Sequence, residues 1–363
     1  MAQEFQFTEI GAIGPGMVTA AFDKQVAYCT AANAPVTARI VQAVRDLLER
    51  GEGGSLLDAI RGWTGAPLAD ALPLRIAGGI HSLHLKGVEP DLAAIYENRE
   101  GIDDAALAAA AIRAHEAELL PWLDGPPQTN EAGRSSSFIA AMLWLADKGL
   151  PPRFDCLEIG SSAGINLMLD RYHYDLGGVQ VGPEPGAMRF APEWKGPPPP
   201  DRRIEIVRTK GCDVAPVDLT DPAQALRLKA YIWPEHTVRF ERMEAAIAEA
   251  RRAAPDLVRM NAADFVEAEL ARPQEPGATR VLMHSIVWQY VPEDQQRRVT
   301  AAMEAAGARA TPDRPLAWIS LEANRVVHNH ELRLRHWPGG AEPVLAARAH
   351  PHGAWIEWGA TEA

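Results

Sequence analysis

One short run near the middle of the chain combines a carboxylate, serines and glycines at a spacing that suits a ligand-binding or catalytic turn. In Asp155–Gly164, an apolar stretch carries Glu158 and then breaks into the small residues of Gly160–Gly164. From Ile165 onward, the apolar residues recur with a helical period. A strand, a turn and a helix form the unit in which backbone N–H groups at a helix N-terminus meet a ligand. We therefore expect the functional site here.

Two known sequence motifs can be compared directly with the residues of this turn. A dinucleotide fingerprint, G-x-G-x-x-G, needs glycines where this chain has Ser162 and Ile165, so a pyrophosphate would be poorly seated. The nucleophile elbow, G-x-S-x-G, matches Gly160–Gly164 and makes Ser162 a nucleophile. The partners of such a serine would follow in the chain order of these hydrolases: Asp264 or Glu322, then His350 or His352.

A third pattern fits the surrounding chain better. Glu158, Gly160, Ser162 and Gly164 resemble the first motif of class I S-adenosylmethionine (SAM)-dependent methyltransferases, with the middle glycine replaced by serine. The resemblance implies that the glycines admit the methionine part of the cofactor and that Glu158 accepts hydrogen bonds from it. A hydrolase elbow follows several strands, whereas the patterns before Asp155 are helical. A turn that only packs a strand tightly on a helix remains a further alternative.

The order of patterns predicts an α/β protein. Residues 1–150 are predicted to form a helical domain or cap, which would cover the methyl acceptor of a methyltransferase. Residues 151–363 alternate strand and helix, which is typical of a Rossmann-like, doubly wound, mostly parallel sheet. A proline-rich insertion over the sheet is expected near 175–203. The expected strands are Cys156–Ile159, Ile204–Val207, Leu257–Met260, Val281–Ile286 and Leu316–Leu321, with a closing hairpin of Val344–Ala349 and Ala354–Trp358.

Ligands of doubly wound sheets lie across the carboxyl ends of the strands. After the second strand, Asp213 or, less well placed, Asp218 could accept hydrogen bonds from ribose hydroxyls. After the third, Asp264 could hold the adenine amino group while Phe265 packs on its ring. Helix or turn capping is the alternative for these aspartates.

The fourth strand leads to the segment where a methyl acceptor would meet the cofactor. Here His284 and Tyr290 are candidate bases and Ser285 a cofactor contact, although the aromatic residues of this segment could equally be core. Glu131 belongs to a polar segment that could act as a lid, or could form a surface ion pair with Arg134. The expected catalytic set is His284, Tyr290 and Glu131. The expected cofactor-binding set is Glu158, Gly160, Ser161, Ser162, Gly164, Asn166, Asp213, Asp264, Phe265 and Ser285.

The amino-acid composition limits the kinds of partner that the protein is expected to bind. The net charge of −12 disfavours nucleic acid and anionic membranes. Three separated cysteines indicate reduced thiols, and the residues from Met1 to Phe5 lack a signal-peptide pattern, so we expect a cytoplasmic protein that does not enter a membrane. His328, His330 and His336 do not have zinc-site spacing, so no metal is expected. Alanine-rich helices allow a homodimer.

Several segments together resemble an uncharacterised bacterial family, classed as a domain of unknown function, whose C-terminal half is similar to class I methyltransferases. The resemblance implies SAM as cofactor and methyl transfer to an unknown small or medium acceptor. A non-catalytic protein that binds SAM or an adenosine derivative is the alternative, and a serine hydrolase using Ser162 comes after it. The marker segments are Pro126–Ser135, Leu157–Leu167 with Asp170–Tyr172, Gly211–Asp218, Trp233–Pro234 with Arg239, Ser285–Tyr290 and His350–Gly353.

Overall fold

A computed structural model describes residues 17–324, 326–327 and 329–359. The chain divides into two compact units. Unit 1 comprises Met1–Thr129 and Asp221–Glu241, and unit 2 comprises Asn130–Thr220 and Arg242–Ala363. His328 and the segment from Met1 to Phe5 lie outside the described residues.

Unit 1 is built from helices around an apolar core. Helix α2 lies against α1 and α6, and α4 lies against α8. The face of α2 that carries Ile40, Val44 and Leu47 is buried. Its N-terminus is capped by Glu235, whose Oε1 accepts hydrogen bonds from Val36 N over 2.6 Å and Thr37 N over 3.0 Å. The helices are α1 (Met17–Ala31), α2 (Pro35–Glu49), α3 (Ser55–Arg61), α4 (Leu72–Lys86), η1 (Pro90–Leu92), α5 (Ala93–Tyr96), α6 (Asp104–Leu119), η2 (Leu120–Leu123), α8 (Pro222–Ala230) and the start of α9 (Thr237–Arg252).

The unit boundaries differ from the expected break near residue 150. Helix α7 (Ser135–Asp147) belongs to unit 2 because it packs against β2, β9 and β10. Its buried side chains, among them Phe138 and Met142, face this sheet region. The segment Asp221–Glu241 returns to unit 1, where Tyr231 joins the helical core.

Unit 2 is a mixed α/β structure with a large, mostly parallel central sheet. Nine strands of the described chain follow the order β5-β12-β11-β10-β9-β8-β1-β6-β7. Strands β7, β6, β1, β8 and β9 run parallel, whereas β10, β11 and β12 continue the sheet as an antiparallel meander. Their bounds are β1 (Arg153–Ile159), β5 (Glu193–Lys195), β6 (Glu205–Asp213), β7 (Leu257–Arg259), β8 (Thr279–Ser285), β9 (Leu316–Asn324), β10 (Asn329–Trp337), β11 (Gly340–Ala349) and β12 (Trp355–Trp358).

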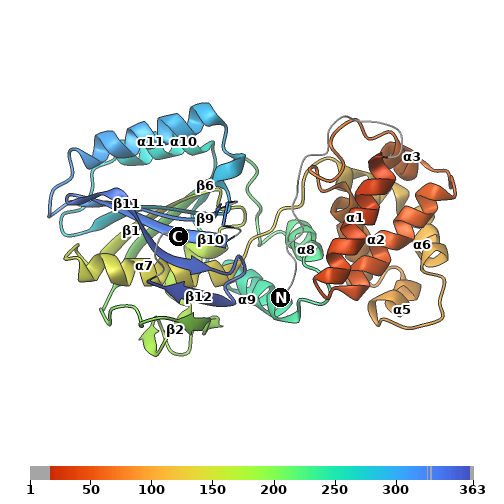
Figure 1. Cartoon of the computed structure of the whole chain (residues 1–363), viewed down its shortest axis with the longest axis horizontal. Helices are drawn as coiled ribbons and strands as arrows, with labels where there is room; N and C mark the ends of the chain where they lie inside the picture. Colours follow the sequence, from red (N-terminus) through yellow and green to blue (C-terminus); the bar gives the residue numbers. More distant parts are fainter. Residues whose placement is uncertain (1–16, 325, 328, 360–363) are drawn as a thin grey trace. The chain divides into compact units, whose positions relative to one another are not determined.

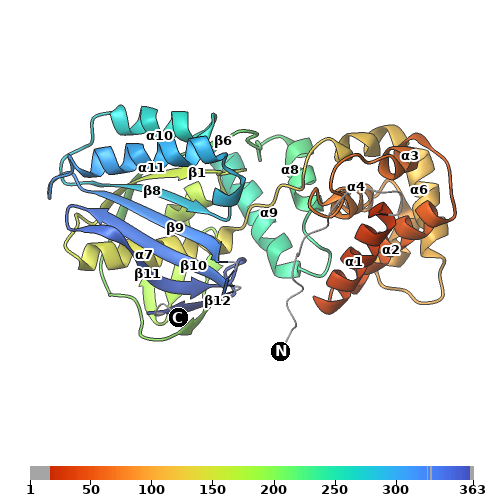
Figure 2. The ribbon, with the colours of Figure 1, turned by 45° about the horizontal axis from the view of Figure 1, so that its top comes forward.

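Helices cover both faces of this sheet. Helices α10 (Ala262–Ala271) and α11 (Glu293–Gly307) lie along one face, and α7 lies along the other (Figures 1 and 2). Phe265 and Val266 of α10 and Met303 of α11 pack into the apolar core with Leu157 and Leu282 of the sheet. The faces of the sheet are thereby closed, and its carboxyl edge carries the loops that follow the parallel strands.

The sequence prediction missed parts of the sheet. Strand β6 runs to Asp213 and does not end at Val207, because Arg208 is ion-paired with Asp155 of β1 and Lys210 with Glu269 of α10. Strand β10, where Leu332 and Leu334 alternate with arginines, was not expected. The proline-rich insertion forms a separate three-stranded sheet of β2 (His173–Leu176), β3 (Val179–Val181) and β4 (Arg189–Phe190), while β5 joins β12.

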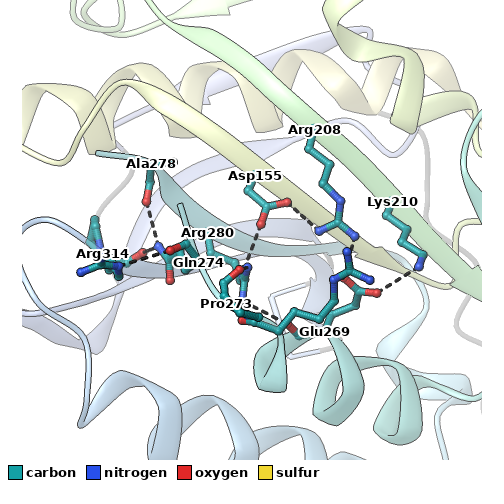
Figure 3. A network of polar contacts seen from close by, with 11 residues as sticks. Asp155, Arg208, Lys210, Glu269, Pro273, Gln274, Ala278, Arg280 and Arg314 are labelled. Carbon is teal, nitrogen blue, oxygen red and sulfur yellow. Dashed lines mark hydrogen bonds and ion pairs between the residues drawn. The ribbon is translucent and has the colours of Figure 1, made fainter. Parts of the chain in front are cut away.

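A buried ionic network joins α10 to the central strands (Figure 3). Asp155 Oδ1 accepts a hydrogen bond from Arg208 over 3.0 Å, and its Oδ2 accepts one from Arg280 over 2.9 Å. Glu269 accepts from Arg208 over 2.6 Å and from Lys210 over 3.0 Å. Arg280 also donates to the carbonyl oxygens of Glu269 and Arg272 near the end of α10. The cation therefore complements the negative end of the helix dipole.

None of the helices in the described chain combines the length and apolarity needed to cross a bilayer.

Candidate functional site

The turn after β1 is held by hydrogen bonds from the protein itself. Ser161 N donates to Cys212 O over 3.0 Å, and Gly164 N donates to Ser161 O over 2.7 Å. Ser162 N donates to Asp213 Oδ2 over 2.8 Å, and Ile165 N donates to Asn130 Oδ1 over 3.0 Å. The expected helix is a short 3₁₀ segment, η4 (Ile165–Arg171). These amides are therefore occupied, and the turn is not the open anion seat that a helix N-terminus offers.

Both glycines of the turn are needed for packing. Gly160 has φ +66°, and a Cβ there would lie 2.2 Å from Val287 Cγ2. Gly164 has φ +70°, and a Cβ there would lie 2.8 Å from Pro255 Cγ. Because protein atoms fill the space that a side chain would take, tight packing explains these glycines without a cofactor.

Ligand chemistry is indicated instead by three unsatisfied polar atoms at the same turn. Oε2 of Glu158, Oγ of Ser162 and Oδ1 of Asn166 are buried without a hydrogen-bond partner among the described residues. The Glu158 carboxylate is 2% exposed, and its Oε1 accepts a hydrogen bond from Asn166 Nδ2 over 3.2 Å. Leaving a buried polar group unpaired costs about 1–3 kcal/mol each. A group of them at one turn requires an explanation, such as an ordered water, an ion or a ligand that completes the hydrogen bonds.

The electrostatics of the turn favour a ligand that donates hydrogen bonds. Burial raises the pKa of Glu158 to about 7, opposed by its bonds with Asn166 and Ser161 and by the charge of Arg134. The neighbouring Asp213 carboxylate raises this pKa further. A cation or hydroxyl donor would stabilise the ionised Glu158, whereas a phosphate would be repelled.

Two residues near the carboxyl ends of neighbouring strands have a left-handed backbone. Ser162 follows β1 with φ +52°, and Ile286 follows β8 with φ +51°. For a β-branched residue such as Ile286 this conformation is rare and costs energy. Ile286 N donates to Leu321 O over 2.9 Å, so its turn is anchored on β9. Strained non-glycine residues cluster at functional sites.

The other expected cofactor residues have structural partners. Each oxygen of the Asp213 carboxylate accepts a backbone hydrogen bond, from Ser162 N and from Ala215 N, both over 2.8 Å. Asp264 is paired with Arg298 over 2.7 Å on the exposed side of α10. Phe265 is buried in the core beneath α10. Asp213 thus shapes the turn beside Glu158, whereas Asp264 and Phe265 hold α10 in place.

His284 is bonded through both ring nitrogens. Trp318 Nε1 donates to His284 Nε2 over 3.0 Å, and because an indole N–H can only donate, the ring proton lies on Nδ1. His284 Nδ1 in turn donates to Glu322 Oε1 over 2.7 Å. The imidazole also stacks on Trp288 at a centroid distance of 5.1 Å. A proton-transfer role would require the bond from Trp318 to break.

Glu131 and Tyr290 differ sharply in environment. Glu131 is buried, and its Oε1 accepts from Gly133 N over 3.1 Å and from Arg242 over 3.2 Å. Its neighbour Arg134 is also buried and donates to the carbonyls of Pro351 and Ser285, so neither residue lies on the surface. Tyr290 is exposed, in the short helix η5 (Trp288–Tyr290) that follows β8.

Two contacts at the site were not assigned from the sequence. Asn130 belongs to the same polar segment as Glu131, which was considered as a lid, and its Oδ1 accepts a hydrogen bond from Ile165 N at the turn. Trp318 was not singled out, although it lies in β9, the neighbour of β8 in the sheet, and donates a hydrogen bond to His284. Its position in an apolar strand gave no sign of a polar role.

Two other kinds of candidate site were considered, a cavity and a metal-binding cluster. A cavity of about 690 Å³ lies in unit 1, lined in part by Arg39, Asp46 and Asp104, and is not part of the β1 turn. The described part of the chain contains no group of three or more His, Cys, Asp or Glu placed to hold a metal ion.

The described residues form a mixed α/β protein in which buried polar atoms without a hydrogen-bond partner gather at the turn after the central strand β1. A family model described as "Uncharacterized protein conserved in bacteria (DUF2332)" matches residues 19–358. The chain belongs to this family. Neither the curated proteins nor the solved structures contain a match to it. The family description names no reaction, so function is argued from the site.

Proposed function

We propose that unit 2 binds SAM at the carboxyl end of β1 and that the protein transfers the methyl group to a small or medium acceptor. The observation that carries this proposal is the group of three buried, unpartnered oxygens on Glu158, Ser162 and Asn166. Each can accept a hydrogen bond, so together they suit a ligand rich in donors.

The functional groups of SAM match a site whose unpaired oxygens accept hydrogen bonds. Its ammonium and ribose hydroxyls are donors, it carries a cationic sulfonium, and it has no phosphate that the Glu158 and Asp213 carboxylates would repel. Glu158 Oε2 would hold the ammonium or a hydroxyl, with Ser162 and Asn166 beside it. The resemblance of Glu158–Gly164 to the first methyltransferase motif selects SAM among donor-rich ligands.

The order of the strands supports the same proposal. The chain passes from β1 to β6 and β7 on one side and returns to β8 and β9 on the other. We interpret this order as Rossmann-like, and in such sheets ligands bind at the carboxyl ends where the direction of winding reverses. The turn after β1 lies at this switch point.

When bound, SAM would supply an electrophilic methyl group: a lone pair of the acceptor would form the new bond to the methyl carbon as the bond from carbon to the sulfonium sulfur breaks, and S-adenosylhomocysteine would leave. The protein's task is then to align the two partners and exclude water. His284 fixes Trp288 through the stacking contact and is itself fixed by Glu322 and Trp318. Tyr290, exposed beside this segment, is the expected residue on the acceptor side.

The proposal is tested by calorimetric titration with SAM and S-adenosylhomocysteine on the wild-type protein, Glu158→Gln and Glu331→Gln. Glu331 is a matched control, since it is a buried glutamate of β10 bonded to Asn324 and Arg333. We expect binding that falls by about 10- to 100-fold in Glu158→Gln, as the loss of a charged hydrogen bond implies, and that is retained in Glu331→Gln. Absence of binding in the wild type contradicts the proposal.

The same preparations separate the alternatives. SAM binding without turnover on any acceptor indicates a non-catalytic binder. Labelling by a fluorophosphonate that is lost in Ser162→Ala, without SAM binding, indicates a serine hydrolase.

A further inference from the structure

Arg134 is a buried arginine at the carboxyl edge of the central sheet. It is 8% exposed, and its Nη1 donates to Ser285 O over 3.4 Å. In the parallel register of β1 and β8, Glu158 lies opposite Met283, so Ser285, two residues further along β8, is level with the start of the β1 turn. The guanidinium is therefore held at the end of the strand next to the one that carries Glu158.

The segment that carries Arg134 spans the carboxyl end of β1. At its start, Asn130 Oδ1 accepts a hydrogen bond from Ile165 N, the first residue of η4, which packs against β6. At its end, Arg134 bonds the last residue of β8. Strands β6 and β8 are the two neighbours of β1 in the sheet. The short helix η3 (Ala132–Arg134) between these contacts also lies against η4.

The position of the guanidinium is fixed by further contacts. Arg134 Nε donates to Pro351 O over 2.9 Å, in the connection between β11 and β12. The preceding residue, Gly133, is packed so closely that a Cβ there would lie 2.6 Å from His352 O. The cation is near enough to Glu158 to lower the pKa of that carboxyl, against the larger effect of burial. A positive group is thus fixed close to the carboxylate whose Oε2 has no partner among the described residues.

A cation and a carboxylate held at one site suit a ligand that carries both charges. SAM has such a group in its methionine part, whose ammonium is a donor and whose carboxylate is the one anion of the molecule. We propose that Arg134 binds this carboxylate while Glu158 accepts from the ammonium. This role rests on the proposed function, and it makes the amino acid part of the cofactor the group that the site selects. A planar guanidinium matches the two oxygens of a carboxylate better than an ammonium does.

The test compares SAM with decarboxylated SAM, which lacks the carboxylate and is otherwise the same. Both are titrated by calorimetry into the full-length wild type, Arg134→Gln, Arg134→Lys and Arg75→Gln. Arg75 of unit 1 is a matched control, because it is 7% exposed and also donates through Nε and Nη1 to two backbone carbonyls, Asp70 O over 2.7 Å and Leu123 O over 2.6 Å. The ratio of the two affinities within one protein is the readout, since a purely structural loss weakens the binding of both ligands alike.

We expect the wild type to bind SAM about 10- to 100-fold more tightly than decarboxylated SAM, as the loss of a charged hydrogen bond implies. This preference should fall to about twofold or less in Arg134→Gln and remain unchanged in Arg75→Gln. It should be intermediate in Arg134→Lys, which keeps the charge but not the planar fork of donors.

A wild type without the preference, or an Arg134→Gln protein that keeps it, overturns the role of Arg134. If circular dichroism shows that Arg134→Gln does not fold, Arg134→Lys decides, and a preference equal to that of the wild type overturns the role.

The two proposals fail in distinguishable ways. If SAM binds and the Arg134 variants leave the preference unchanged, only the carboxylate role is refuted. If SAM does not bind the wild type, the proposed function is refuted, and the role of Arg134 is refuted with it.

Discussion

Asn166 Nδ2 donates a hydrogen bond to Oε1 of Glu158 over 3.2 Å, while Oε2 of the same carboxylate is buried without a partner in the described chain. One oxygen is thus oriented by the protein and the other is left to a ligand. The buried oxygen without a partner destabilises the folded protein when no ligand is bound.

Glu158→Gln should stabilise the free protein increasingly as the pH rises. The pKa of Glu158 is raised from 4.5 to about 7 by burial, so between these values the folded state keeps a proton that the unfolded state has lost. The free energy of unfolding of the wild type therefore falls as pH rises through this window, by about 3 kcal/mol in all. The difference in Tm between Glu158→Gln and wild type, measured from pH 4.5 to 8, should grow with pH. A difference that is constant across this range contradicts the assignment.

The variants Ser162→Gly and Ser162→Ala should differ from each other in stability, whereas both should bind SAM with the same reduced affinity. Ser162 has φ +52°, which glycine adopts without strain and alanine does not, so the glycine variant should be up to about 1 kcal/mol more stable than the alanine variant. Both lack the unpartnered Oγ, so both should bind SAM more weakly than wild type. Urea unfolding and calorimetry measure the two quantities. Unchanged SAM affinity in both variants would show that Oγ is not a ligand contact.

His81 should make the protein less stable in acid. This histidine of unit 1 is 4% exposed, its Nδ1 bonds Ala230 O over 2.9 Å, and burial lowers its pKa from 6.5 to about 4. As the pH falls from 6.5 to 4, the unfolded state gains a proton that the folded state excludes, so stability is lost by about 3 kcal/mol. In His81→Asn this part of the pH dependence should disappear, as seen in thermal unfolding at pH 4.5 and 7.5. An unchanged acid slope contradicts the prediction.

Arg280→Ala should be strongly destabilising. Arg280 is 4% exposed, and its loss removes the donor to Asp155 Oδ2 and to the carbonyls at the end of α10, leaving Arg208 as the cation bonded to Asp155. Removing one partner from a buried ion pair costs about 3–5 kcal/mol. The control is Arg314→Ala, whose side chain is 48% exposed and donates to Gln274 O over 3.2 Å, with an expected loss of under about 1 kcal/mol. Denaturant unfolding of both variants is the measurement, and equal losses would contradict a structural role for the network.

The spacing of apolar residues predicted those helices and strands that have one apolar face and one polar face. The helix at Pro35–Glu49 and the strands β1, β7, β8 and β9 were expected because their apolar residues recur at the right interval. Helix α4 was missed because it is buried nearly all round, from Leu72 to Leu83, and therefore lacks a polar face. Strand β10 was missed because Leu332 and Leu334 are the only aliphatic residues of Asn329–Trp337, so the apolar alternation there is short.

At the site, the sequence indicated the turn but not the role of each residue. The glycine spacing located Gly160–Gly164, yet the structural reason for these glycines is contact with Val287 and Pro255, which are distant in sequence. Likewise, no local pattern could show that His284 receives a hydrogen bond from Trp318. Which polar atoms remain unpaired depends on the folded packing, so the unpartnered oxygens could be identified only from the structure.

A crystal structure of the protein with S-adenosylhomocysteine is the most direct test of SAM binding at the β1 turn. We predict that the ligand lies at the carboxyl end of β1, with donors within hydrogen-bond distance of Glu158 Oε2 and with Ser162 Oγ or Asn166 Oδ1 also engaged. A ligand bound elsewhere, with Glu158 Oε2 still unpartnered, would contradict it.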